Sequence, residues 1–133
     1  MGINEENVLA LAYLGDSVYE LRIRDYLLSL NIHKVNKLQK EALKYVTAKK
    51  QCIFINYFLD NNLLTEEEID IVKRGRNKKV NSHPKNTDIV TYKWATGFEC
   101  LFGYLYLDNN KDCGFSPPQS FFGLFFKFFH TLF

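Results

Sequence analysis

Two carboxylates stand alone in long uncharged stretches of this 133-residue sequence. Asp16 is the only charged residue among positions 7–19, and Glu99 is the only charged residue among positions 94–107. An ionised carboxylate is costly to bury unless it is paired, hydrogen-bonded or bound to a metal ion. The two residues therefore call for a common explanation.

A shared metal site is one such explanation. If both stretches form helices that pack together, Asp16 and Glu99 converge on one point. Two oxygen donors suit Mg²⁺, which keeps several waters and is commonly held by one or two carboxylates together with a substrate phosphate. Such an ion activates water and stabilises the charge on a phosphodiester during hydrolysis. The alternative for each carboxylate is a helix cap or an ion pair with a nearby Lys or Arg.

A basic segment lies just before the stretch that contains Glu99. Residues 73–85, KRGRNKKVNSHPK, hold six basic and no acidic residues, which leaves eleven basic and fifteen acidic residues elsewhere from totals of 17 and 15. One basic patch on a mildly acidic body favours a polyanionic partner. A solvated surface charge is the alternative for each lysine of the segment.

The elements that must position these residues are expected to be helices, which makes the fold class all-α. Apolar residues recur at helical spacing, and Gly and Pro are scarce up to residue 113. The pattern predicts five or so helices, among them one that ends near Asn31, one from about 36 to 58, one that opens at a Thr65 capping box, and one from about 87 to 107. The expected apolar face of the first is Leu9, Tyr13, Val18 and Leu21, and that of the second is Leu38, Ala42, Tyr45, Val46 and Ile53.

Length and composition favour a single folded domain in a reducing compartment. The chain is 47% hydrophobic, and its three cysteines have no metal-ligand spacing. No basic region followed by an apolar run opens the sequence, and no uncharged apolar stretch is long enough to span a bilayer. We expect a soluble, cytoplasmic protein with no membrane partner.

The last 25 residues differ from the rest. The sequence NNKDCGFSPPQS has the composition of a linker, and residues 121–133, FFGLFFKFFHTLF, hold seven phenylalanines. Three interpretations are open. The tail is an apolar helix that packs on the body or on a partner subunit, or it is a membrane-surface anchor with only Lys127 on its polar face, or it is not the ancestral end of the gene.

The sequence resembles a known family in several separated motifs. LALAYLGDSVYE resembles the signature helix of the ribonuclease III family, and TGFECLFGYLYLD resembles that family's second metal-binding segment. LTEEEIDIVKRGRNKK, followed by PKNTDIVTYKWATGFECLFGYLYL, is similar to the Mini-III ribonucleases, short bacterial members that lack a separate double-stranded-RNA-binding domain. The resemblance runs from about Val8 to Leu107. It implies a single helical domain with the ribonuclease III catalytic fold over residues 1–108, followed by an atypical tail, residues 109–133.

The carboxylates of the larger family members are only partly present. Those enzymes read Glu-x-x-Glu-x-x-x-Asp in the first segment and Asp-x-x-Glu in the second, and the corresponding positions here are Leu9, Ala12, Asp16, Thr96 and Glu99. The last carboxylate of each motif is retained, and Mini-III enzymes share this reduced set. The resemblance therefore implies that Asp16 and Glu99 are catalytic and bind Mg²⁺. For the nearby Glu20 we expect a salt bridge with Arg24.

The same resemblance assigns the basic segment to RNA. The residues expected to contact phosphates are Arg74, Arg76, Lys78, Lys79 and Lys85, with Asn77 and His83 as contacts to sugars. Arg76, in RGRN, matches the Mini-III motif best. Trp94 and the neighbouring tyrosines are expected in the core or in a dimer contact, with stacking on RNA bases as the alternative. His33 and His130 are expected to be structural or surface residues.

The implied activity is Mg²⁺-dependent hydrolysis of double-stranded RNA by a homodimer, leaving a 5′-phosphate and a 3′-hydroxyl. The implied process is maturation of the ends of the large-subunit (23S) ribosomal RNA precursor, with a ribosomal protein assisting. The alternative is a non-catalytic dimer that binds structured RNA, which would bind without Mg²⁺ and leave the RNA intact. The resemblance fails after about Asn110, and we hypothesise that a frame change or truncation replaced the native ending.

Overall fold

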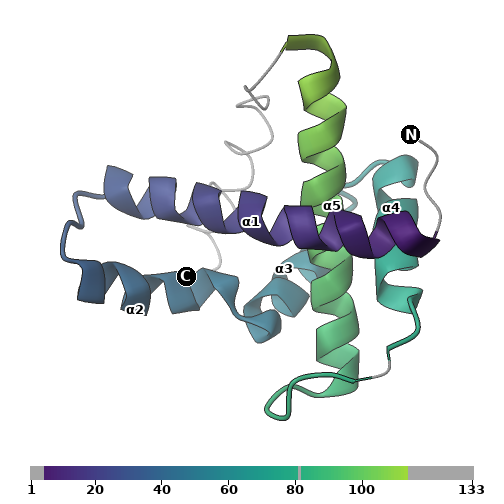
Figure 1. Cartoon of the computed structure of the whole chain (residues 1–133), viewed down its shortest axis with the longest axis horizontal. Helices are drawn as coiled ribbons and strands as arrows, with labels where there is room; N and C mark the ends of the chain where they lie inside the picture. The colour runs from purple at the N-terminus through teal and green to yellow at the C-terminus, as the bar shows by residue number, and fades with distance from the viewer. Residues whose placement is uncertain (1–4, 81, 114–133) are drawn as a thin grey trace.

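The computed structural model describes residues 5–80 and 82–113, which form five α-helices and no strand (Figure 1). The helices are α1 (Glu5–Ser29), α2 (Val35–Val46), α3 (Ala48–Asp60), α4 (Glu66–Asn77) and α5 (Ile89–Cys113). The expected all-α class and the single helical domain are confirmed.

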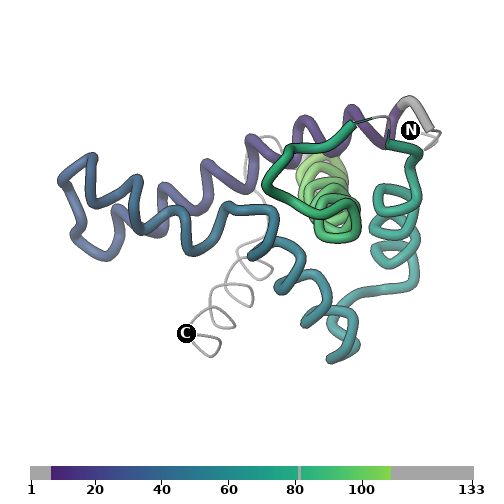
Figure 2. Tube along the Cα trace, turned by 90° about the horizontal axis from the view of Figure 1, so that it is seen from below, coloured from purple at the N-terminus to yellow at the C-terminus, as the bar shows by residue number. Residues whose placement is uncertain are grey.

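Helix α5 is the central element. It makes its most extensive contact with α1, and α4 and α3 pack against it as well. Figure 2 shows α5 end on, with α1, α3 and α4 around it. Helix α2 pairs with the C-terminal half of α1 (Figure 1). The two helices that carry Asp16 and Glu99 are therefore packed directly on each other.

An aromatic cluster fixes α1 against α5. The ring of Tyr19 lies 4.8 Å from that of Phe98 and 5.0 Å from that of Phe102, in edge-to-face geometry. All three side chains are buried. The Tyr19 hydroxyl donates a hydrogen bond of 2.8 Å to the carbonyl oxygen of Tyr45. Aromatic pairs add about 0.5–1.5 kcal/mol to the area they bury, so this cluster holds α1, α2 and α5 in one arrangement.

The buried face of α1 differs from the predicted one. Leu9, Tyr13 and Leu21 were expected in the apolar face, but they are 50%, 83% and 56% exposed. The buried residues of α1 are Val8, Leu11, Ala12, Val18, Tyr19, Ile23 and Leu27. Residues 8–15 are all apolar or glycine, so spacing alone does not define which side of this part of the helix meets the core. The contacts with α5 decide it.

The helix predicted from about 36 to 58 is two helices. Thr47 lies between them with an extended backbone (φ −69°, ψ 153°), and its hydroxyl accepts a hydrogen bond of 3.3 Å from the backbone N–H of Lys50. A threonine N-cap of this kind stabilises a new helix start. The change of direction leaves Ile53 44% exposed. The other members of the predicted face, Leu38, Ala42, Tyr45 and Val46, do pack against the core.

The predicted capping box at the start of α4 is confirmed. Thr65 Oγ1 accepts a hydrogen bond of 3.2 Å from Glu68 N, and Glu68 Oε1 accepts one of 2.8 Å from Thr65 N. The carboxylate of Asp88 accepts hydrogen bonds from the backbone N–H and the hydroxyl of Thr91 at the start of α5. Both helices that flank the basic segment thus have defined starts.

Helix α5 ends later than predicted. It continues through Cys113, six residues beyond Leu107. Residues 109–113, which were expected to belong to a linker, are therefore helical. The Phe-rich residues 121–133 lie outside the described residues. Among the described helices, none combines the length and hydropathy needed to cross a membrane.

Candidate active site

Helices α1 and α5 cross in backbone contact at two glycines. A Cβ atom on Gly15 would overlap the backbone carbonyl of Glu99, and a Cβ atom on Gly103 would overlap the backbone carbonyl of Leu11. Glycine alone permits so close an approach. Asp16 follows Gly15 directly, so the crossing places Asp16 beside the turn of α5 that carries Glu99.

A second pair of glycines holds α4 against the other side of α5. A Cβ atom on Gly75 would lie 2.7 Å from Cys100 Sγ, and one on Gly97 would lie 2.7 Å from the carbonyl oxygen of Val72. Glu99 therefore sits on a length of α5 clamped between α1 and α4. This contact also fixes the end of α4, where the basic segment begins.

The pKa values of both carboxyl groups are raised. Burial, and then the charge of Asp16, raise the pKa of Glu99 from 4.5 to about 8. Asp16 is an exposed residue, yet partial burial of its carboxyl group, followed by the charge of Glu20, raises its pKa as well. Within residues 5–80 and 82–113, no hydrogen bond or ion pair satisfies either carboxylate. The expected Glu20–Arg24 salt bridge is confirmed at 2.8 Å.

This donor set fits a divalent cation. Two adjacent carboxylates that lack a cationic partner repel each other, and a bound cation would relieve that repulsion. No group of three or more His, Cys, Asp and Glu side chains gathers in the described part of the chain. Water and a substrate phosphate would therefore complete the coordination, which is the usual arrangement for Mg²⁺.

Glu99 lines a cleft of about 360 Å³ between α1, α5 and the basic segment. Leu9, Ala12 and Thr96, the positions at which larger ribonucleases III carry carboxylates, line the same cleft, as do Lys78 and Lys79. Asp16 is absent from the lining and acts on the cleft through its charge on Glu99. The structure thus brings both predicted motifs and part of the basic segment together.

Arg76 is held over an aromatic ring at the end of α4. Its guanidinium carbon lies 4.7 Å from the centroid of the Trp94 ring, and its Nε donates a hydrogen bond of 3.0 Å to Asn77 Oδ1. A cation–π contact of this kind orients the planar guanidinium group. Trp94 also packs against the main core cluster, as expected. Arg76 is therefore pre-positioned on a rigid support.

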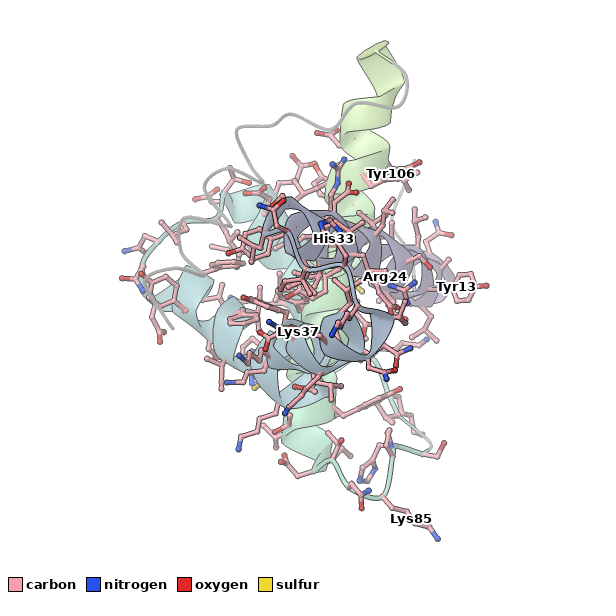
Figure 3. All side chains as sticks on the ribbon, turned by 90° about the vertical axis from the view of Figure 1, so that its left-hand side faces the viewer. Tyr13, Arg24, His33, Lys37, Lys85 and Tyr106 are labelled. Atoms are coloured by element: carbon pink, nitrogen blue, oxygen red, sulfur yellow. The ribbon has the colours of Figure 1, made fainter. Side chains whose placement is uncertain are left out.

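The remaining predicted RNA contacts are spread along the basic segment. Arg74 forms an ion pair with Asp70, with 2.9 Å between Nε and Oδ2. The ring of His83 lies 6.4 Å from that of Tyr92, which lines the cleft. Lys85 is exposed, and Figure 3 shows its side chain extended into solvent at the tip of the connection between α4 and α5. The structure places these residues around the cleft without placing all of them in it.

The four glycines of the crossings were missed as determinants of the site. The signal was present, because Gly15, Gly75, Gly97 and Gly103 interrupt helical patterns in which glycine is unfavourable by about 1 kcal/mol relative to alanine. A glycine retained inside such a pattern indicates close packing of another backbone.

Comparison with known proteins identifies the class. Residues 9–110 match the family model of the ribonuclease III domain, which covers most of the chain. The chain belongs to the ribonuclease III family and is an endoribonuclease. A crystal structure of a protein from Fusobacterium nucleatum superposes with a TM-score of 0.69 at 33% identity, covering 79% of this chain and 82% of that one.

The similar curated relatives carry a more specific name. The Mini-ribonuclease 3 of Enterococcus faecalis is 51% identical over 106 residues, which cover 80% of each chain. The Mini-ribonuclease 3 of Acholeplasma laidlawii is 54% identical over 99 residues, or 74% of this chain and 78% of the relative. That of Streptococcus pneumoniae is 46% identical over 110 residues, or 83% and 86%. The resemblance to Mini-III ribonucleases is therefore confirmed.

Proposed function

We propose that this protein cleaves double-stranded RNA in a reaction that requires Mg²⁺ held by Asp16 and Glu99. The observation that carries the proposal is the pair of carboxylates itself. They are adjacent at a backbone-packed helix crossing, the pKa of Glu99 is raised, and no described side chain neutralises them. Lys78 and Lys79 line the cleft that Glu99 enters, so a phosphate in that cleft would meet both lysines and the Glu99 carboxyl group.

The residues of the chain divide the work as follows. A bound Mg²⁺ would supply a Lewis acid that activates water and neutralises charge on the scissile phosphate. Asp16 and Glu99 would hold the cation, and Glu99 would give up its proton on binding it. Lys78 and Lys79 hold the phosphodiester in the cleft. Attack of water on phosphorus, with departure of the 3′ oxygen, leaves a 5′-phosphate and a 3′-hydroxyl.

The basic segment supplies the affinity for RNA in this proposal. Its phosphate contacts are Arg74, Arg76, Lys78, Lys79 and Lys85, and Asn77 and His83 contact sugars. Because these contacts release condensed counterions, affinity should fall steeply as salt is raised. Arg76 is the strongest contact, since the Trp94 ring already orients its guanidinium group.

We infer that the active form is a homodimer. Leu9, Tyr13 and Leu21 are exposed apolar side chains on α1, the helix that carries Asp16. Exposed apolar area of this kind favours a self-complementary contact, and a two-fold contact along α1 would bring two sites together, one for each RNA strand. Light scattering on the purified protein measures the oligomeric state directly.

The biological role that we propose is maturation of the ends of the large-subunit rRNA precursor in the cytoplasm, with a ribosomal protein assisting on the precursor particle. The catalytic unit would span residues 1–108, and the tail residues 109–133. The family match ends at residue 110, close to this boundary.

The test is incubation of the protein with long double-stranded RNA in Mg²⁺ and in EDTA, beside the Asp16→Asn variant. Cleavage that requires Mg²⁺ and is lost in the variant supports the proposal. If the wild-type protein binds the RNA but leaves it uncut at every Mg²⁺ concentration, the proposed cleavage activity is contradicted. The protein would then be a non-catalytic RNA-binding protein.

A further inference from the structure

A second lysine-rich stretch lies outside the site described above. Residues 34–50, KVNKLQKEALKYVTAKK, contain six lysines and one acidic residue, Glu41. They form α2 and the first turn of α3. The cleft uses none of these residues.

The lysines of α2 gather on one side of the helix. Lys37, Lys40 and Lys44 are three and four residues apart, which places them on one helical face, and all three are exposed. Leu38 and Tyr45 pack toward the core instead. Figure 3 shows the side chain of Lys37 on the surface formed by α2.

Glu41, the single acidic residue of this stretch, is surrounded by lysines that lower its pKa. Glu41 Oε2 lies 2.9 Å from Lys44 Nζ. The hydrogen bond with Lys44, followed by the charges of Lys44, Lys37 and Lys40, lowers the pKa of Glu41. One carboxylate among three lysines leaves an excess of positive charge on this face.

The stretch lies close to the start of α5 at one end. Burial, and then the charge of Asp88, raise the pKa of Cys52 in α3, while hydrogen bonds with Asn56 and with Thr91, at the start of α5, lower it. Lys49 is exposed and lies one helical turn before Cys52. Figures 1 and 2 agree that the α2–α3 junction lies beside the connection that carries Lys85. The lysine-rich stretch and the basic segment therefore approach each other at the start of α3.

The C-terminal turn of α2 is tied to α1, the helix that carries Asp16. The Tyr19 hydroxyl donates its 2.8 Å hydrogen bond to the carbonyl oxygen of Tyr45, and Tyr19 lies one turn after Asp16 on α1. The rings of Tyr26 and Tyr45 are 6.0 Å apart. These contacts hold the lysine face of α2 at a fixed position relative to Asp16.

We propose that Lys37, Lys40 and Lys49 form a second phosphate-binding surface, which extends the RNA contact from the cleft across α3 and α2. This inference rests on the proposed function, because it needs an RNA substrate seated at the cleft. RNA is favoured over an acidic protein because the surface lies near the basic segment and because lysines act as point charges on a phosphate backbone.

The test compares Lys37→Gln/Lys40→Gln/Lys49→Gln with the charge-preserving Lys37→Arg/Lys40→Arg/Lys49→Arg. Binding to a long RNA duplex is measured in EDTA at several salt concentrations, so that no cleavage step enters. At about 0.9 per phosphate contact, loss of three contacts makes the slope of log K against log salt less steep by roughly 3. We expect at least a tenfold loss of affinity near 0.1 M salt for the Gln variant, with the Arg variant close to wild type.

The outcomes separate this inference from the proposed function. If the Gln variant binds and cuts RNA like wild type, the lysine surface does not bind RNA, and the proposed function still stands. An acidic protein would then be the remaining candidate partner for that surface. If wild type neither binds nor cuts RNA, both fail. A Gln variant that keeps its maximal cleavage rate at saturating RNA but needs at least tenfold more RNA supports the inference, since these lysines lie outside the cleft.

Discussion

Replacement of Glu99 by Gln should stabilise the protein in the absence of metal while removing its response to Mg²⁺. The pKa of Glu99 is about 8 in the folded chain against 4.5 as its ordinary value. At 1.36 kcal/mol for each pKa unit, ionising this group inside the fold costs up to about 4–5 kcal/mol. Since water penetration and relaxation reduce such penalties, we expect Glu99→Gln to raise the free energy of unfolding by about 2–4 kcal/mol at pH 8 in EDTA.

The pH dependence gives the sign of the effect. Because the folded-state pKa lies above the unfolded-state value, the unfolded chain releases its proton first as the pH rises. The wild-type protein therefore loses stability between about pH 4.5 and about pH 8, and the penalty is absent below that window. Gln resembles the protonated carboxyl group, so the difference between variant and wild type should shrink toward zero near pH 4.5.

Thermal unfolding followed by circular dichroism provides the assay. For a chain of this size, a 2–4 kcal/mol gain raises Tm by about 8–15 °C. Mg²⁺ at ten times its Kd should stabilise the wild type by about 1.4 kcal/mol and leave the variant unchanged. The exposed Glu66→Gln serves as a matched control and should shift stability by less than about 0.5 kcal/mol. Equal Tm values for wild type and Glu99→Gln at pH 8 in EDTA would refute the reasoning.

Four further substitutions test the contacts that build the site. Gly15→Ala should cost about 3 kcal/mol or more in urea unfolding, because its Cβ atom would overlap the backbone of α5; a cost below 1 kcal/mol would contradict the close crossing. Thr65→Ala should cost about 1 kcal/mol through loss of the capping box, and an unchanged urea midpoint would count against that cap. Tyr19→Phe should cost about 1–2 kcal/mol in the same assay, since it leaves the Tyr45 carbonyl without its donor; a neutral result would argue against that hydrogen bond. Arg76→Ala should weaken RNA binding about tenfold in a filter assay and flatten its salt dependence by about one contact, whereas an unchanged slope would remove Arg76 from the interface.

Two kinds of feature were predicted correctly from the sequence. One is local hydrogen bonding between residues close in the chain, and the other is the proximity of two carboxylates that stand alone in uncharged stretches. The capping box of Thr65 and Glu68 is a local hydrogen-bond pattern and needs no tertiary contact. Asp16 and Glu99 were conspicuous because uncharged residues surround them. Their proximity followed from the expectation that both helices pack in the core.

The features missed are those that tertiary contacts decide. Nothing local distinguishes Tyr13, which is 83% exposed, from Tyr19, which is buried, because both are apolar positions on an apolar helix. The contacts of Tyr19 with Phe98 and Phe102 make the difference. The break at Thr47 was missed for a similar reason, since threonine is tolerated inside helices and acts as a cap only where the chain must turn.

The backbone contact at Gly15 and Gly103 has a consequence for how the enzyme tolerates change. Side-chain packing elsewhere sets how firmly the fold holds, but the separation of Asp16 and Glu99 is set by two main chains that touch. Repacking of the aromatic cluster should therefore alter the fraction of molecules that are folded, while each folded molecule keeps the same turnover rate. Stability can then drift through generations of mutation while the separation of the two carboxylates stays fixed, provided that both glycines are retained.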